Sequence, residues 1–260
     1  MEDFADNKIK QISIMCSAQS AKTETMLALL AWLVSEDPGP CMWVTSNEEE
    51  ALKFATERLM PSMRNCPPVA VKIPSSNRLA KSREIYFPGM TLEVVGSNAP
   101  SKLQSKPRRW LLLDEVRNWP PGALPMVLKR TRTFWNARQV IVSTPGHEHD
   151  AVHQQFLAGN QNTWHVDCAK CGKEHALDWK YIAWDVNEKT KPEGMYNFDA
   201  LAKTIRMECP FCAHQTHDTP FERRKLTEGR WVALNESSQE SKKSYTWNAM
   251  LPTWVKWRDL

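Results

Sequence analysis

The sequence lacks a long hydrophobic run. Within its 260 residues the longest stretch of nonpolar side chains is Met26 to Val34. A membrane-spanning helix needs about 20 such residues, so this run predicts a buried helix instead. The first ten residues, MEDFADNKIK, contain early acidic groups and no apolar segment, which excludes a secretory signal peptide. We therefore expect an intracellular protein with no membrane partner.

A strong net charge is also absent. The value of +4 is too small to identify a partner, and three clusters of basic residues could either neutralise phosphates or form a solvated face. Hydrophobic residues make up 42% of the chain, enough for a buried core. The seven cysteines are an odd number in a chain expected to be intracellular, so a disulfide framework is not expected.

Glycine is missing where a phosphate-binding loop would have it. The pattern GxxxxGK[ST] between a strand and a helix binds nucleotide phosphates, and the aligned stretch here has Cys16 and Ala21 at the glycine positions. Lys22 can still supply charge for the β- and γ-phosphates of ATP, and Thr23 a hydroxyl for Mg²⁺. An ordinary strand–turn–helix is the alternative. The residues expected to bind the nucleotide are Ser17, Ala18, Gln19, Ser20, Ala21, Lys22 and Thr23.

Two further strand ends carry polar groups that suit nucleotide hydrolysis. The apolar stretch 110–113 ends at Asp114 and Glu115. Asp114 would hold Mg²⁺, and Glu115 would polarise the attacking water. The next predicted strand ends at Thr144, which could sense the γ-phosphate or simply end the strand in a turn. The predicted catalytic residues are therefore Glu115, Lys22, Asp114 and Thr144.

Strand-like and helical stretches alternate through the first part of the chain. Asn47 and Glu50 form a capping-box pattern that predicts the start of a helix lasting to about Met60. The alternation predicts an α/β P-loop NTPase with a mainly parallel central sheet flanked by helices, whose ligands bind beyond the carboxyl ends of the strands. The predicted strands are 9–15, 41–45, 84–87, 91–95, 110–113 and 139–143, and the first predicted helix is 24–34.

Paired cysteines mark a different region. Two CxxC turns let four thiolates surround one ion, which predicts a closed, structural Zn²⁺ site at Cys168, Cys171, Cys209 and Cys212. Two unrelated or redox-active turns are the alternative. Four nearby histidines could substitute as ligands, although the cysteines already fill a tetrahedral shell; they are His165, His175, His214 and His217. We predict a P-loop ATPase domain at 1–160, a zinc-ribbon-like module at 161–235 and a linker at 236–260. Seven of the twelve tryptophans follow residue 160, and we expect them to build a core rather than to stack on bases.

In this order, these segments resemble the large terminase subunit of lambda-type tailed bacteriophages. The resemblance runs through ISIMCSAQSAKTE, the stretch FPGMTLEVVGSNAPSKLQSKPRRWLLLDEV, RQVIVSTPG, both CxxC turns and SYTWNAMLPTWVKW. It places Gln19, Lys22 and Thr23 on the family's phosphate loop. It also places Ser143 and Thr144 on its coupling segment. Ala21 departs from the family's glycine and adds a methyl group close to the phosphates.

The resemblance implies an ATP-hydrolysing motor, working with Mg²⁺ in the cytoplasm of the bacterial host, that pumps double-stranded DNA into a capsid. It implies a small terminase subunit, a portal or procapsid, and a homo-oligomeric ring as partners. No candidate for the family's nuclease carboxylates remains, so we expect no DNA cleavage, and the segment before the phosphate loop is expected to be short. Candidate arginine fingers are Arg58, Arg78 and Arg83. A helicase-like DNA-dependent ATPase is the first alternative. The second is an inert prophage remnant that binds DNA or capsid partners through its zinc module.

Overall fold

The computed structural model describes residues 2–76, 80–236 and 240–260. Its chain forms two compact units. The first unit consists of Met1–Met15, Ala21–Gln161 and Asn235–Tyr245, and the second of Cys16–Ser20, Asn162–Leu234 and Thr246–Leu260. No helix among the described residues combines the length and hydrophobicity needed to cross a bilayer.

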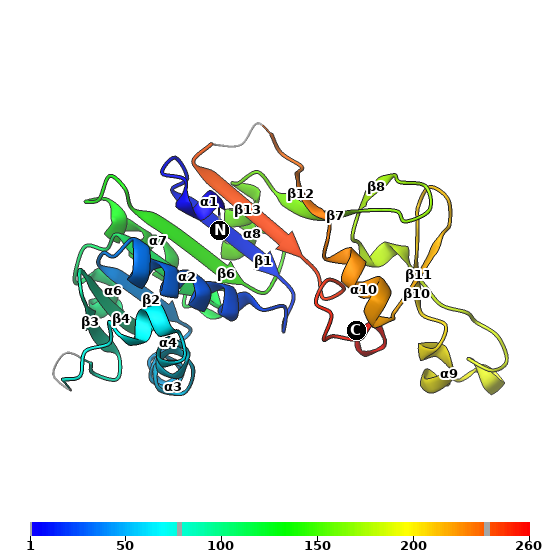
Figure 1. Ribbon diagram of the computed structural model, residues 1–260, viewed down its shortest axis with the longest axis horizontal. Helices are drawn as coiled ribbons and strands as arrows, with labels where there is room; N and C mark the ends of the chain where they lie inside the picture. The colour runs from blue at the N-terminus through cyan, green and yellow to red at the C-terminus, as the bar shows by residue number, and fades with distance from the viewer. Residues whose placement is uncertain (1, 77–79, 237–239) are drawn as a thin grey trace. The chain divides into compact units, whose positions relative to one another are not determined.

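The first unit is built on a mainly parallel sheet (Figure 1), as the sequence predicted. Its strand order is β13-β1-β6-β5-β2-β4-β3, with parallel pairing from β1 through β4 and an antiparallel edge between β4 and β3. The strands are β1 (Gln11–Cys16), β2 (Cys41–Thr45), β3 (Glu84–Phe87), β4 (Met90–Gly96), β5 (Trp110–Asp114), β6 (Arg138–Ser143) and β13 (Lys242–Trp247).

Helical segments cover both faces of this sheet, which explains why a central strand such as β5 is buried along its whole length and nonpolar up to Asp114. On one face Leu111 and Leu113 pack into a core cluster with Val127 of α7. On the other, Trp110 stacks on Phe4 with ring centroids 5.3 Å apart. The helical segments are α1 (Glu2–Ala5), α2 (Lys22–Glu36), α3 (Glu48–Phe54), η1 (Ala55–Leu59), α4 (Met60–Arg64), α5 (Pro67–Ala70), α6 (Pro100–Gln104), η2 (Val116–Asn118), α7 (Ala123–Leu128), η3 (Lys129–Thr131) and α8 (Ala151–Leu157).

The helix predicted to start at Asn47 is confirmed, but it is not regular. The Asn47 side chain accepts a hydrogen bond from the Glu50 N–H at 2.9 Å, as the capping box predicted. Directly after α3, η1 is a π-helix, in which the Met60 N–H donates to the Ala55 carbonyl. Pro61 follows directly and has no N–H with which to continue the regular ladder. The helical run consequently widens at η1.

The second unit has short strands and a small core. Its two hairpins join β7 (Asn162–Asp167) to β8 (Glu174–Ala176) and β10 (Arg206–Glu208) to β11 (Gln215–His217). The other strands are β12 (Arg230–Ala233), paired with β7, and β9 (Ile182–Ala183), paired with β10. The helical segments are η4 (Trp179–Tyr181), η5 (Pro192–Gly194), α9 (Phe198–Ala202), α10 (Pro220–Leu226) and η6 (Trp257–Asp259). The buried core consists of Val166, Leu177, Ile205, Met207, Leu226, Met250 and Trp257.

The last segment of the chain differs from the predicted linker over 236–260. Strand β13 lies next to β1 in the sheet of the first unit. Met250 and Trp257 are buried in the core of the second unit. The described residues of this segment therefore contribute to both folded cores, and the division of the chain into domains stays a prediction.

Candidate functional site

The start of α2 leaves backbone donors free for an anion. Strand β1 ends at Cys16, one residue beyond the predicted strand, and α2 begins at Lys22, two residues before the predicted helix start. Ala21 caps the helix in a left-handed conformation, with φ of 65°, and provides no side-chain hydrogen bond to the first turn. This conformation explains why the common pattern has glycine here, since a Cβ at positive φ costs about 1 kcal/mol. Gln19 also has a positive φ of 54°.

The first turn of α2 meets the acidic end of β5. The Lys22 ammonium is buried and lies 3.4 Å from the Glu115 carboxylate. The Thr23 hydroxyl donates to Asp114 Oδ2 at 3.4 Å. The structure therefore brings together four predicted residues, Lys22, Thr23, Asp114 and Glu115, from two distant parts of the sequence.

Burial perturbs the carboxyl group of Asp114 at this edge. Its side chain is 6% exposed, and burial, reinforced by the neighbouring Glu115 charge, raises its pKa to about 6 despite Lys22. Its Oδ1 atom is buried without a hydrogen-bond partner among the described residues. Two adjacent oxygens of an octahedral Mg²⁺ shell lie about 3.0 Å apart. The Thr23 and Asp114 oxygens, 3.4 Å apart, fit such a pair of ligands.

The strand between β1 and β5 carries the predicted coupling segment. Met15 of β1 and Ser143 of β6 are paired in register, so β6 ends beside the start of the phosphate loop. Ser143 is fully buried, and its hydroxyl accepts a hydrogen bond from the Arg117 N–H at 3.1 Å. The Arg117 guanidinium donates to the Pro145 carbonyl at 3.0 Å. Both residues flanking Thr144 are thus hydrogen-bonded to Arg117 of η2, which directly follows Glu115.

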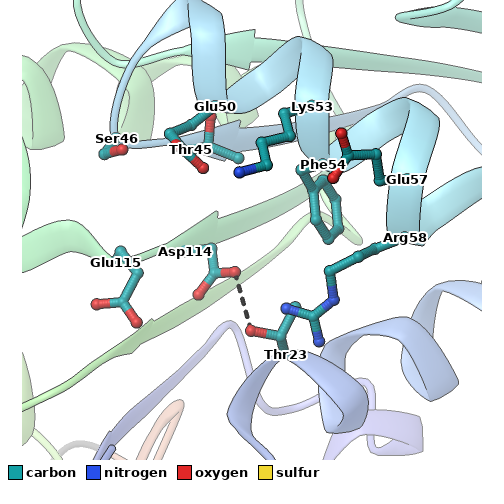
Figure 2. A pocket seen from close by; sticks show the side chains of 10 residues that line it. All are labelled: Thr23, Thr45, Ser46, Glu50, Lys53, Phe54, Glu57, Arg58, Asp114 and Glu115. Atoms are coloured by element: carbon teal, nitrogen blue, oxygen red, sulfur yellow. Dashed lines mark hydrogen bonds between the residues drawn. The ribbon is translucent and has the colours of Figure 1, made fainter.

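A cleft of about 340 Å³ opens at this edge of the sheet (Figure 2). In Figure 2 Lys53 and Arg58 extend from the helical side of the cleft toward Asp114 and Thr23. The polar end of β2 could have indicated Thr45. The lining residues of α3 and η1 have the spacing of one helix face, but no sequence pattern indicates that this face lines a cleft. The lining residues that sequence reasoning missed are Thr45, Ser46, Glu50, Lys53, Phe54 and Glu57.

The three candidate arginines have different surroundings. Arg58 lines the cleft and forms an ion pair with Glu24 at 2.7 Å. Arg83 pairs with Glu48 at the start of α3. Arg78 lies outside the described residues.

The remaining predicted loop residues, 17–20, lie in the second unit. The Ser20 hydroxyl donates to the Ser17 carbonyl. Ser17 Oγ is buried with no partner among the residues that the structure describes. The indole N–H of Trp254 donates to the Gln19 carbonyl at 3.0 Å, and that of Trp247 to the Ser20 carbonyl at 3.2 Å. Sequence reasoning missed both indole contacts because no local pattern signals them.

The four predicted cysteines of the second unit form one cluster. All four sulfur atoms lie within 4.8 Å of one another, with separations of 3.7 Å for Cys168–Cys212 and 3.9 Å for Cys171–Cys209. Four sulfurs bonded tetrahedrally to Zn²⁺ at about 2.3 Å are about 3.8 Å apart. The donor set therefore fits zinc.

Each CxxC turn lies at the tip of a hairpin and has the same hydrogen bonds. The Gly172 N–H donates to the Cys168 carbonyl and the Ala213 N–H to the Cys209 carbonyl, both at 2.9 Å. Burial would raise the pKa of the Cys168 thiol, but the N–H groups of Cys171 and Lys170 outweigh it and lower this pKa to about 7. Such N–H groups stabilise the thiolate that binds a metal.

The histidines near the cysteines have other contacts. His165 lies 3.0 Å from Glu174 through Nδ1 and 3.0 Å from Thr163 through Nε2. Burial, followed by the Arg230 charge, lowers its pKa. His175 is buried and packs edge-on against Tyr181. Among the described residues, the metal-ligand cluster contains cysteines alone.

The fold defines the class of protein: a mixed α/β domain with a mainly parallel central sheet. The family model described as phage terminase large subunit gpA, ATPase domain, matches residues 1–231. The chain belongs to this family. No curated protein matches it.

Two solved structures match part of this chain. One is the large terminase ATPase domain of Thermus phage P74-26, at 19% identity and a TM-score of 0.45, covering 58% of this chain and 65% of that one. The other is an arginine-to-alanine mutant of the same domain, at 18% identity and a TM-score of 0.45, covering 62% and 68%. The chain thus spans about two thirds of the phage domain.

Proposed function

We propose that this chain is an ATP-hydrolysing motor part of a phage enzyme that packages double-stranded DNA. The observation that carries the proposal is the meeting of the Lys22–Thr23 helix start with Asp114 and Glu115. Phosphoryl transfer needs positioned charges and a positioned water more than covalent help from the protein. This edge of the sheet offers a cation, a hydroxyl, a metal-binding carboxylate and a second carboxylate.

Each residue has a defined task in this proposal. Lys22 binds the β- and γ-phosphates, and Thr23 and Asp114 hold Mg²⁺, which neutralises developing negative charge on the phosphates. Glu115 orients the attacking water as general base. Thr144 senses the γ-phosphate from the end of β6, and Arg117 passes its displacement to η2 through the Ser143 and Pro145 contacts.

The ion pair between Lys22 and Glu115 also has a consequence for catalysis. At 3.4 Å the ammonium neutralises the carboxylate and competes with water for it. A bound triphosphate draws the ammonium away, because it offers several anionic oxygens in place of one carboxylate. Glu115 then becomes free to accept a proton from water when substrate is present.

Phosphate release in the presence and absence of double-stranded DNA tests the function. Lys22→Ala and Glu115→Gln should each lower ATP turnover by at least about a hundredfold, since both remove transition-state interactions. The matched control is Lys8→Ala, which removes an exposed lysine of the same unit and should leave turnover unchanged. Equal turnover in the Lys22→Ala protein and the parent chain would refute the proposal. Separation of a forked DNA duplex would favour the helicase-like alternative.

The partners follow from family membership and stay part of the proposal. They are a small terminase subunit, a portal or procapsid, and further copies of the chain in a ring, all in the host cytoplasm. We assign the four cysteines to a structural Zn²⁺, because their sulfur separations suit a closed tetrahedral shell. Counting bound zinc per chain tests this assignment.

A further inference from the structure

Two tryptophan side chains form hydrogen bonds with the backbone of the predicted phosphate loop. The indole N–H groups of Trp254 and Trp247 donate to the consecutive carbonyls of Gln19 and Ser20, at 3.0 and 3.2 Å. The Trp247 carbonyl in turn accepts from the Ser17 N–H at 3.3 Å. Three hydrogen bonds thus connect this loop to the chain around Trp247 and Trp254.

These contacts orient two peptide planes of the loop. In a trans peptide the carbonyl of one residue and the N–H of the next point in opposite directions. With the Gln19 and Ser20 carbonyls directed at the indoles, the N–H groups of Ser20 and Ala21 are directed away from them. Successive N–H groups held in this way make an anion-binding concavity.

The indole contacts also explain how the loop keeps its conformation without glycine. Gln19 and Ala21 both have positive φ, at 54° and 65°, which is unfavourable for residues with a Cβ. Such strain persists only where the surrounding structure enforces it. Hydrogen bonds to the two carbonyls between these positions supply that enforcement.

The two indoles are themselves held in place. The Trp247 ring packs on Trp231 with centroids 5.9 Å apart, and Trp231 packs on Trp164 at 5.0 Å. The segment carrying Trp254 is fixed by Arg223 of α10, a buried side chain. Arg223 donates to the carbonyls of Met250, Pro252 and Val255 on both sides of Trp254.

We propose that Trp247 and Trp254 are positioning residues that preset the phosphate loop, so that its N–H groups receive the triphosphate of ATP. The proposal rests on the ATPase function proposed above. Because the indoles act on the part of the loop that binds phosphate, they affect every ligand with a triphosphate equally, whatever base it carries.

Phenylalanine variants test the tryptophans, since they keep an aromatic ring and remove the donor. Calorimetry would measure the affinity of Trp247→Phe, Trp254→Phe and the double variant for Mg·ATP and for Mg·tripolyphosphate. We expect each single change to weaken both ligands about fivefold and the double change about twentyfold, by the same factor for both. Trp135→Phe is the matched control, because Trp135 is 81% exposed and lies in the first unit. Affinities within twofold of the parent protein in the double variant would overturn the proposal.

A second measurement separates failure of this proposal from failure of the ATPase function. A parent chain that binds neither ligand would refute the function. Hydrogen exchange of the indole protons, assigned in ¹⁵N-tryptophan spectra from the single variants, needs no nucleotide. We expect the Trp247 and Trp254 indole protons to exchange at least about tenfold more slowly than that of Trp135, because they are hydrogen-bonded. Equal rates would overturn the tryptophan contacts themselves.

Discussion

The two compact units of this chain reach stability in different ways. The first unit has a sheet whose central strand β5 is buried along its whole length, with nonpolar side chains on both faces. The second has strands of two to six residues and a small core cluster, and its hairpin tips meet at four cysteines. A small core supplies little hydrophobic free energy, so a metal ion held by the four cysteines would stabilise this unit. We therefore expect metal loss to destabilise mainly the second unit, and a cavity in the hydrophobic core to destabilise mainly the first.

Loss of the metal should have the largest effect, and it should be confined to the second unit. We expect Cys168→Ser, or a strong chelator, to unfold residues 162–234, because structural zinc contributes about 10 kcal/mol or more of folding free energy. Zinc content should fall, and proteolysis should cut this region while sparing the first unit. Cys66→Ser, which changes a free cysteine of the first unit, is the control. Retention of zinc and of protease resistance in Cys168→Ser would contradict the comparison.

A cavity next to the sheet should destabilise the first unit and leave the second unit intact. Leu112 of β5 is fully buried, and Leu112→Ala should lower the free energy of unfolding of the first unit by about 2–5 kcal/mol. Urea denaturation measures the change, and the zinc content should stay the same. Leu52→Ala, at a side chain 45% exposed, should change stability by less than about 0.5 kcal/mol. A loss of zinc in Leu112→Ala would show that the units do not respond separately.

The buried carboxylate of Asp114, at the end of β5, should lower the stability of the fold although the proposed function needs it. The pKa of Asp114 rises from 3.8 to about 6 on folding, so the folded chain holds an extra proton between these values, and stability falls as pH rises through this window. Asp114→Asn should therefore raise the unfolding free energy at pH 7 by about 1–3 kcal/mol in the absence of Mg²⁺. Thermal unfolding with and without Mg·ATP measures this. An unchanged or lowered melting temperature without Mg²⁺ would refute the destabilising role of this carboxylate.

The smallest effect should come from the helix cap. Ala21 has φ of 65°, so Ala21→Gly should relieve steric strain and raise stability by about 0.5–1 kcal/mol. A melting temperature a few degrees higher is the expected result. Ala18→Gly is the matched control, since Ala18 is not among the residues with positive φ, and it should stabilise nothing. Equal shifts in both variants would point to flexibility rather than strain.

Local patterns predicted strands β1 to β6 and two helical stretches of the first unit. The strand 41–45, the hairpin around Gly89 and the Asn47 cap were all predictable, because each depends on side chains within a few residues of one another. The pairing of residues within the cysteine cluster was predictable too, since the CxxC spacing itself brings two thiolates together. The functional roles of the site residues stay predictions.

Features that depend on distant residues were not predictable in this way. Glu57 and Arg58 of η1 line the cleft, and which neighbouring elements that helical face meets depends on the packing of the whole unit. The segment 236–260 gave no strand signal strong enough to reveal β13, whose place in the sheet depends on β1. Such arrangements minimise the free energy of the whole fold, and no short window of sequence contains the interacting partners.

Residue types and short spacings were enough to predict the α/β class and to select Lys22, Thr23, Asp114, Glu115 and the four paired cysteines as candidate site residues. Tertiary structure alone decided that β6 lies between β1 and β5, and that the Lys22 ammonium lies 3.4 Å from Glu115. It also decided that two indoles bond to the Gln19 and Ser20 carbonyls. The physical reason is that strand order and long-range hydrogen bonds are set by packing among segments far apart in the chain.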